Sequence, residues 1–201
     1  HRDQHAMYIP KHFHITDRDE ISAFIEHHAF GQIISTLKGK LFSSHLPFLV
    51  SDDRQKILGH FARHNPQCNE INEQEVLITL EGPHGYISPS WYINPGVPTW
   101  DYQAVHIYGV CKIIPQLDAV KTIVDTLSNK YEKAFETYWE PEYNAGMLKH
   151  IVGFEVEITD IQCKYKLSQN RSEQDVGSVI EHLEARGSKA LADAVKATNK
   201  Q

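Results

Sequence analysis

The sequence lacks several features that would by themselves assign it to a class. It has no apolar run near the roughly 20 residues that a membrane-spanning helix needs and no recognisable signal peptide, so we expect a cytoplasmic protein without a membrane partner. Its three cysteines, Cys68, Cys111 and Cys163, are widely spaced and form no Cys-x-x-Cys pair. This spacing argues against a disulfide framework and a thiolate zinc site. No nucleophile elbow, phosphate-binding Gly-x-x-x-x-Gly-Lys loop or acid–base pair is recognisable.

An excess of basic residues is also missing. The 201 residues include 20 Lys and Arg against 26 Asp and Glu, a formal net charge of −6. A protein with this charge has no global field that attracts it to nucleic acid. The helix predicted over 173–187 carries acidic residues on its surface, which also disfavours entry into a DNA groove. DNA is therefore a partner that the charge does not support.

The pattern of apolar residues predicts a mainly β protein with flanking helices. Strands are predicted at 30–37, 41–50, 56–61, 75–81, 104–114 and 154–158, the last with a continuation to 167. Helices are predicted at 16–29, 118–135, 173–187 and 188–197, with a short one that begins at Ala62 and is interrupted by Pro66. Ser172, with Asp175 three residues later, is the predicted cap of the helix at 173–187. Because short polar connections favour antiparallel hairpins, about six strands of this kind indicate a β-barrel.

The most unusual stretch is a long loop predicted between the strands at 75–81 and 104–114. It carries Trp91, Tyr92, Trp100 and Tyr102 among four prolines. Prolines lower the entropy lost on ordering, and aromatic rings offer flat faces, so the loop suits the wall of a pocket for a flat ligand. Burial of the rings over one end of the barrel explains the composition equally well.

Several stretches together resemble the PaiB family of FMN-binding negative transcriptional regulators. They are Gly-Pro-His-Gly-Tyr-Ile-Ser-Pro-Ser-Trp-Tyr at 82–92, Val-Pro-Thr-Trp-Asp-Tyr at 97–102, Val-His-Ile-Tyr-Gly at 105–109, Met-Tyr-Ile-Pro-Lys-His-Phe at 7–13, Ser-His-Leu-Pro-Phe at 44–48, Leu-Gly-His-Phe-Ala-Arg-His-Asn-Pro at 58–66 and Lys-Leu-Ser-Gln-Asn-Arg-Ser at 166–172. The resemblance implies the FMN-binding split β-barrel, similar to pyridoxine phosphate oxidases, and a homodimer with flavin at the subunit interface. We expect residues 1–6 to be an upstream extension, 7–167 the split-barrel domain and 168–201 a C-terminal helical appendage.

FMN requires cations or hydroxyls for its phosphate and a flat apolar slot for its ring system. The phosphate candidates are Ser43, Ser44, His45, His60, Arg63 and Asn65. Similar split barrels supply such contacts from a strand followed by a short helical turn, which the resemblance carries over to Arg63. The ring candidates are Trp91, Tyr92, Trp100 and Tyr102. A polar run before a capped helix adds Lys166, Ser168, Gln169, Asn170 and Arg171, because helix starts bind anions readily; a solvated loop is the alternative.

The 13 histidines raise the question of metal or haem. His60 and His64 are four residues apart and would share one face of a helix, but Pro66 limits such a helix and no acidic third ligand is adjacent, so we expect no metal. Because some split-barrel relatives bind haem, His84 or His106 as an axial ligand is an alternative. Three functions remain open: a flavin-binding repressor, a flavin-dependent oxidoreductase with indirect regulatory effects, and a haem-binding split barrel.

Overall fold

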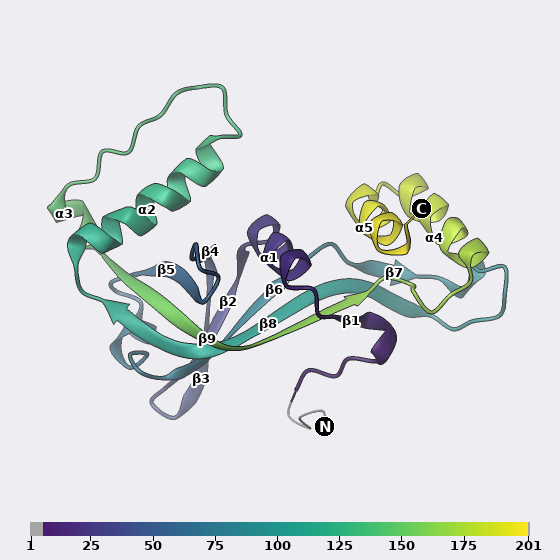
Figure 1. Ribbon diagram of the computed structural model, residues 1–201, viewed down its shortest axis with the longest axis horizontal. Coiled ribbons are helices and arrows are strands. Elements are labelled where there is room, and N and C mark those ends of the chain that lie inside the picture. Colours follow the sequence, from purple (N-terminus) through teal and green to yellow (C-terminus); the bar gives the residue numbers. More distant parts are fainter. Residues whose placement is uncertain (1–5, 201) are drawn as a thin grey trace. The chain divides into compact units, whose positions relative to one another are not determined.

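The computed structural model describes residues 6–200 (Figure 1). The helices are η1 Lys11–Phe13, α1 Arg18–His27, η2 Pro66–Asn69, η3 Pro89–Trp91, α2 Leu117–Glu132, α3 Ala145–Leu148, α4 Glu173–Ala185 and α5 Lys189–Asn199. The strands are β1 His14–Ile15, β2 Phe30–Leu37, β3 Lys40–Pro47, β4 Leu49–Val50, β5 Lys56–Ala62, β6 Glu75–Glu81, β7 Gly85–Ile87, β8 Thr99–Ile114 and β9 Ile151–Lys166. Residues 1–5 of the predicted extension, and residue 201, lie outside the described residues.

The strands form a nine-stranded sheet with the order β3-β2-β6-β8-β9-β5-β4, while β1 pairs with β9 and β7 with β8. Strand β3 pairs antiparallel with β2, and β4 pairs antiparallel with β5. Because β3 and β4 belong to one stretch of chain, the last strand of the order leads back to the first and the sheet closes into a barrel. The predicted mainly β fold with flanking helices is confirmed.

The chain divides into two compact units. Unit 1 comprises residues 1–21, 81–105 and 162–201, and unit 2 comprises 22–80 and 106–161. The two long strands β8 and β9 run through both units, so neither unit is one continuous piece of chain. The predicted division of the chain at residue 168 stays a prediction.

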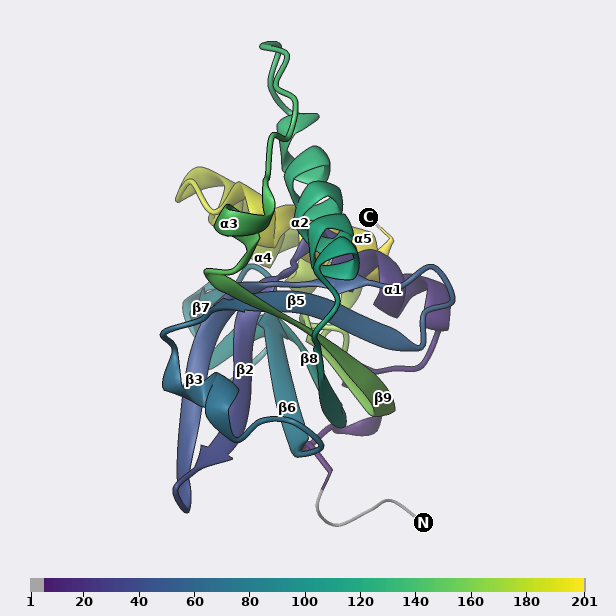
Figure 2. The same cartoon turned by 90° about the vertical axis from the view of Figure 1, so that its left-hand side faces the viewer.

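Unit 2 contains the closed part of the barrel. In Figure 2, β5 crosses one side of it and β2, β3 and β6 form another. Phe48, Phe61 and Phe154 are fully buried at its centre, with the rings of Phe61 and Phe154 4.8 Å apart. Gly59 on β5 makes room for this cluster, because a Cβ at residue 59 would lie 2.6 Å from Phe154 Cζ. The aromatic packing therefore requires glycine at residue 59.

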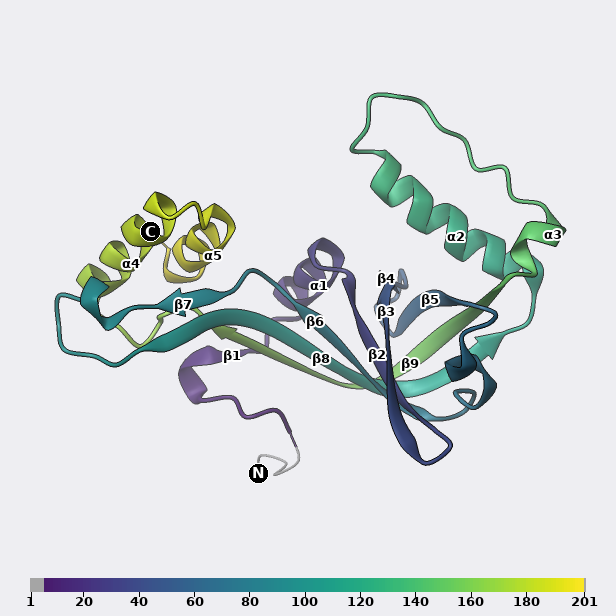
Figure 3. The same cartoon turned by 180° about the vertical axis from the view of Figure 1, so that it is seen from behind.

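Helix α2 covers the outside of unit 2, where it packs against β5 (Figure 3). Its buried residues Val120, Ile123 and Val124 lie on one stripe, and Val120 and Ile123 approach Gly153 of β9. The opposite face carries charged residues, of which Lys121 and Asp125 form an (i, i+4) ion pair. The helix was predicted over 118–135 and is observed over 117–132.

Helices α4 and α5 form a hairpin in unit 1, beside β7 (Figure 1). Ser172 caps α4 by accepting a hydrogen bond from the Asp175 N–H, as predicted. The turn after α4 uses Gly187 at φ +80°, a left-handed conformation that glycine adopts without a Cβ clash. Both helices bury one apolar face, which consists of Val176, Val179, Ile180, Leu183, Leu191, Ala192 and Val195.

The structure corrects three predictions. The long aromatic loop is shorter than predicted, because β7 pairs with the start of β8 and brings residues 85–87 and 99–101 into the sheet. The helix predicted to begin at Ala62 is wrong, since β5 extends to Ala62 and the 3₁₀ helix η2 begins only at Pro66, where a missing N–H costs nothing. The strand predicted over 41–50 is two strands, which Phe48 separates.

Among residues 6–200, no helix combines the length and apolar character that crossing a bilayer requires. That part of the chain also contains no group of three or more His, Cys, Asp or Glu side chains arranged to hold a metal ion.

Candidate functional site

The structure divides the candidate residues between the two units. The phosphate candidates from 43 to 65 all belong to unit 2, whereas the four aromatic candidates and the polar run from 166 to 171 belong to unit 1. The two sets of candidate residues therefore belong to different compact units.

In unit 2, β5 is followed by a turn and then by η2, which is the strand and short helical turn that the family resemblance implied. Ser44 Oγ donates a hydrogen bond of 2.5 Å to Gln67 Oε1 and accepts one of 2.9 Å from Asn65 Nδ2. Gln67 is buried, and its amide donates to the carbonyl of Ile33, the carbonyl of Phe42 and Ser35 Oγ. The hydroxyl of Ser44 and the amide of Asn65 are thus engaged within this corner, and they hold η2 against β2 and β3.

Arg63 lies at the end of β5 and is exposed. Its Nε donates to the carbonyl of Lys149 at 2.5 Å, and its Nη2 donates to the carbonyl of Ile151 at 3.2 Å. Its backbone N–H donates to the intervening carbonyl of His150. These partners are neutral, and a guanidinium has five N–H groups. The charge and the remaining donors of Arg63 can therefore meet an anion from solvent.

The other phosphate candidates of unit 2 have weaker claims. His60 Nδ1 is buried without a hydrogen-bond partner among the described residues, and burial lowers the pKa of His60, which favours the neutral ring. His60 lies in β5 and not on a helix, so it shares no helical face with His64. Ser43 Oγ donates to Gln32 Oε1, and the exposed ring of His45 stacks on Phe30.

In unit 1, Lys166 and Arg171 lie beside the remaining aromatic loop. Lys166 Nζ donates to Thr99 Oγ1 and, at 2.9 Å, to the carbonyl of Trp100. Arg171 forms an ion pair with Asp175 at 2.5 Å and donates to the carbonyls of Asn94 and Pro95. Both cations therefore tie the segment at 166–171 to the loop.

Two buried carboxylates, Asp175 and Asp101, complete this network. Asp175 accepts from the backbone N–H groups of Ile93 and Asn94 as well as from Arg171. Asp101 accepts a 2.7 Å hydrogen bond from Ser168 Oγ, and burial raises its pKa to about 6, although Ser168 and Lys166 act in the opposite direction. An aspartate on an alternating strand shows no sign in the sequence of facing inward, so no local signal could have identified Asp101.

Tyr92, Asp101, Lys166 and Arg171 line a cavity of about 150 Å³ together with Phe13, Val97, Thr99, Ser168 and the exposed Asn170. This volume is below the 300–1,000 Å³ typical of sites for small organic molecules, and it could hold a phosphate group but not a whole flavin. Gln169 lies outside the cavity lining, where its amide bonds the N–H of Leu167 and the carbonyl of Tyr165.

The four aromatic candidates have different surroundings. Trp91 stacks on His182 at 5.2 Å, the Arg171 guanidinium lies 3.8 Å from the centre of the Tyr92 ring, and the Lys164 ammonium lies 5.1 Å from that of Tyr102. Trp100 alone is largely open, at 49% exposed, and its indole N–H donates to His84 Nδ1. All four rings therefore contact protein groups, since Trp100 lies beside His84 and Tyr86, but Trp100 leaves the largest share of its surface open to a flat ligand.

Residues 7–160 match the model of a family described as "Putative FMN-binding domain". "Protease synthase and sporulation protein PAI 2" of Bacillus subtilis (strain 168) is 43% identical over 186 residues, which cover 89% of each chain. A protein of Aspergillus fumigatus, AFUA_5G13800, is 30% identical over 238 residues, covering 88% of this chain and 91% of that one.

Solved structures with the same fold share little sequence. An FAD- and haem-binding protein from Mycobacterium smegmatis has a TM-score of 0.63 at 13% identity, covering 82% of this chain and 79% of the other. The flavocytochrome Anf3 from Azotobacter vinelandii has a TM-score of 0.61 at 14% identity, covering 82% and 75%. At such identities the likeness shows the fold alone, which is the split barrel.

The residues of unit 2 fit an FMN phosphate. The Arg63 guanidinium bonds only neutral backbone carbonyls among the described residues, so its positive charge is not compensated. Arg63 also lies at the strand and turn where the family resemblance predicts the group that binds the phosphate. The match over 7–160 includes this corner but not the polar run from Lys166 to Arg171. The family model and the extended identity to PAI 2 agree with the motifs read from the sequence. The chain therefore belongs to the PaiB family of FMN-binding proteins, with a split-barrel fold and FMN as its cofactor.

Proposed function

We propose that this protein is an FMN-binding homodimer that acts as a negative regulator of transcription. The observation that carries the proposal is the 43% identity over 89% of both chains to a protein whose name refers to protease synthesis and sporulation. Identity of this extent along the whole chain supports a shared role more strongly than a shared fold does. The bound FMN then makes repression responsive to flavin supply or flavin redox state.

We assign the phosphate of FMN to Arg63. The guanidinium is fixed by two carbonyls of the segment at 149–151, so it loses little further entropy when it binds an anion. Ser44 and Asn65 act as supports through Gln67, whereas Ser43 and His45 lie on the opposite face of β3 from Ser44. When bound, FMN supplies redox chemistry, while the protein orients it and sets its electrostatic surroundings.

The homodimer is supported by an exposed aromatic cluster on the β7–β8 hairpin. Trp100 and Tyr86 are each 49% exposed. The ring of Trp100 lies about 6 Å from the ring of His84 and about 6 Å from the ring of Tyr86. Clusters of this kind mark interaction surfaces in soluble proteins. Analytical ultracentrifugation should show a dimer that Trp100→Ala together with Tyr86→Ala weakens, and a monomeric wild type would contradict the proposal.

The flavin site is tested by titrating the protein with FMN and following the quenching of flavin fluorescence. Arg63→Ala should weaken FMN binding about tenfold, the range expected for a lost charge-assisted hydrogen bond. Arg63→Lys keeps the charge and should recover part of the affinity, and Arg18→Ala removes an exposed arginine elsewhere as the matched control. Thermal unfolding of each variant separates a lost anchor from a lost fold. Unchanged FMN affinity in a folded Arg63→Ala variant would remove Arg63 from the site.

A flavin-dependent oxidoreductase is the second candidate, and the net charge of −6 favours it because a direct DNA-binding surface is not evident. Helix α4, for example, exposes Glu173, Glu181 and Glu184. Selection of bound fragments from random duplex DNA, at several salt concentrations, separates the two. A repressor should enrich one sequence with a salt-dependent affinity, while an oxidoreductase should enrich none and should oxidise a reduced nicotinamide when FMN is bound.

A further inference from the structure

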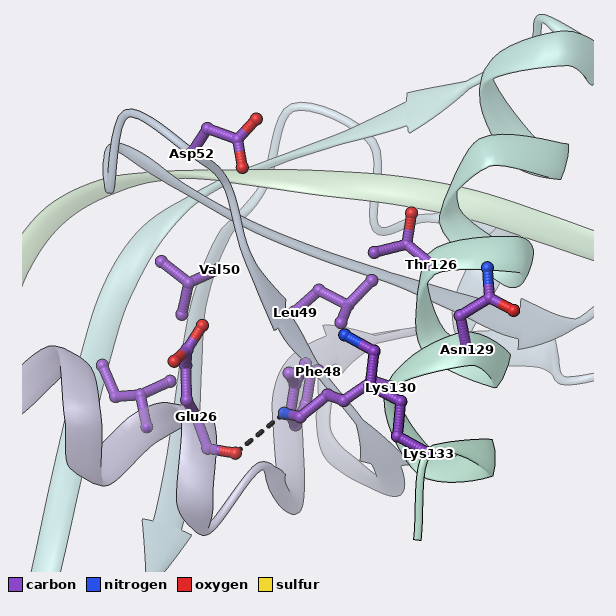
Figure 4. Close-up of a pocket in the computed structure, with 10 residues that line it drawn as sticks. Glu26, Phe48, Leu49, Val50, Asp52, Thr126, Asn129, Lys130 and Lys133 are labelled. Carbon is purple, nitrogen blue, oxygen red and sulfur yellow. Dashed lines mark hydrogen bonds between the residues drawn. The ribbon is translucent and has the colours of Figure 1, made fainter. Parts of the chain in front are cut away.

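A second cavity lies wholly within unit 2, between the end of α1, strand β4 and the C-terminal half of α2 (Figure 4). Its volume of about 370 Å³ is more than twice that of the cavity around Tyr92 and Lys166. This volume is in the range of sites that hold small organic ligands. No residue singled out for FMN lines it.

Two chemically different walls face each other across this cavity. One is apolar and comes from the buried Phe48 and Leu49 with Val50. The other consists of Thr126, Asn129, Lys130 and Lys133 of α2. Their spacing of three, four and seven residues puts these four side chains on one face of the helix. An apolar wall opposite polar, cationic groups suits an amphipathic ligand.

The two lysines differ in what holds them. Lys130 Nζ donates a 2.8 Å hydrogen bond to the backbone carbonyl of Glu26, one of the last carbonyls of α1, so it caps that helix. The Lys133 side chain is exposed, and its ammonium has no hydrogen bond or ion pair among residues 6–200. Figure 4 shows its side chain extending from α2 toward Leu49. The hydrogen bond that caps α1 accounts for the position of Lys130. The ammonium of Lys133 lies beside an apolar wall and has no such partner among the described residues.

Two carboxylates limit the charge of a ligand. Glu26 and Asp52 also line the cavity, and Figure 4 shows Asp52 on the turn after β4, away from the lysines. Their two negative charges balance the two ammonium groups. A ligand with one negative charge gains from Lys130 and Lys133, whereas a dianion such as a phosphate monoester meets added repulsion from the carboxylates.

We propose that this cavity binds a small organic carboxylate, with its apolar body against Leu49 and Val50 and its charge between Lys130 and Lys133. The cavity is separate from the FMN anchor, because it adjoins β4 and the turn that leads into β5, whereas Arg63 follows the other end of β5. A ligand here would contact both α1 and α2 and thereby stabilise their positions on the barrel. The site gives a flavin protein a second input, an organic acid.

The test uses 2-naphthoate and its neutral analogue 2-naphthalenemethanol, each titrated by calorimetry into the protein with and without FMN. The acid should bind about tenfold more tightly than the alcohol. Lys133→Gln should abolish this difference, and Lys40→Gln, which removes an exposed lysine at the start of β3, should preserve it. Amide NMR shifts should locate the acid at Val50 and Asn129.

Three results would overturn the proposal. Equal affinities for the acid and the alcohol would show that the lysines do not select charge. A preference that persists in Lys133→Gln would place the anion elsewhere. Displacement of naphthoate by FMN would make the cavity the flavin site. The measurement without FMN keeps these outcomes independent of the FMN assignment to Arg63, since the cavity can bind the acid even if that assignment fails.

Discussion

The cations considered for ligand binding in unit 1 and in unit 2 are of the same residue types but differ in the charge of their partners. In unit 1, Arg171 pairs with the buried Asp175, and Lys166 lies near the buried Asp101. In unit 2, the Arg63 guanidinium meets only backbone carbonyls among residues 6–200, and the Lys133 ammonium has no partner there. A cation that a buried carboxylate neutralises holds loops together, whereas one with neutral partners keeps its charge for a ligand. Residue type alone does not distinguish the two roles.

The hydrogen bonds of Gln67 in unit 2 should contribute more to stability than those of Gln169 in unit 1. Gln67→Ala should lower the free energy of unfolding by about 4 kcal/mol, because it removes three hydrogen bonds, two of them buried, and opens a cavity. Gln169→Ala in unit 1 removes two hydrogen bonds of a half-buried side chain and should cost about 1 kcal/mol. Urea unfolding at pH 7 measures both. Equal losses would show that the two networks contribute alike.

The buried carboxylate of unit 1 should make stability depend on pH. Burial raises the pKa of Asp101 to about 6 from its ordinary value of 3.8, so the folded protein binds the proton more tightly than the unfolded chain does. The Asp101 contribution therefore favours the fold below pH 4 and is lost as the pH rises to 6, by about 3 kcal/mol in total. Asp101→Asn keeps an acceptor for Ser168 and should be the more stable protein at pH 7.5.

Urea unfolding of the wild type and Asp101→Asn at pH 4, 5, 6 and 7.5 measures this difference. Ser168→Ala serves as the control, since it removes the hydrogen bond to Asp101 and keeps the carboxyl. A difference between the wild type and Asp101→Asn that stays constant with pH would show that Asp101 titrates normally.

Arg63 should contribute less to stability than to binding. Removing its two side-chain hydrogen bonds in Arg63→Ala should lower the free energy of unfolding by about 1 kcal/mol, because the side chain is exposed and water replaces the lost donors. Chemical unfolding without FMN measures the loss. A loss several times larger would make Arg63 mainly a structural residue of the α3–β9 turn.

Lys133 should show the smallest effect of all. Lys133→Gln should change the free energy of unfolding by no more than about 0.5 kcal/mol, as is usual for an exposed side chain without partners. Lys130→Gln removes the hydrogen bond to the Glu26 carbonyl and should cost more, about 1 kcal/mol. The same unfolding experiment compares them, and a larger effect for Lys133 than for Lys130 would contradict the distinction between a free and a capping lysine.

The sequence alone determined the elements whose signals are local. Strands 30–37 and 75–81 were predicted to the residue, and the cap of α4 at Ser172 was read from hydroxyl and carboxyl spacing. Alternation and capping depend on neighbours within about four residues, which a sequence displays directly. The motifs also determined the family, and with it the split barrel and FMN.

Only the tertiary structure decided what depends on partners far apart in the chain. Strand β8 starts as early as Thr99 because its first residues pair with β7. Asp101 is buried beside the segment that carries Ser168, whose hydroxyl donates to its carboxylate. Arg63 bonds carbonyls 86 and 88 residues away. The cavity with Lys133 exists because α2 lies over β4 and α1. Burial and charge balance are properties of these distant contacts, so no local pattern could reveal which cations remain available to bind a ligand.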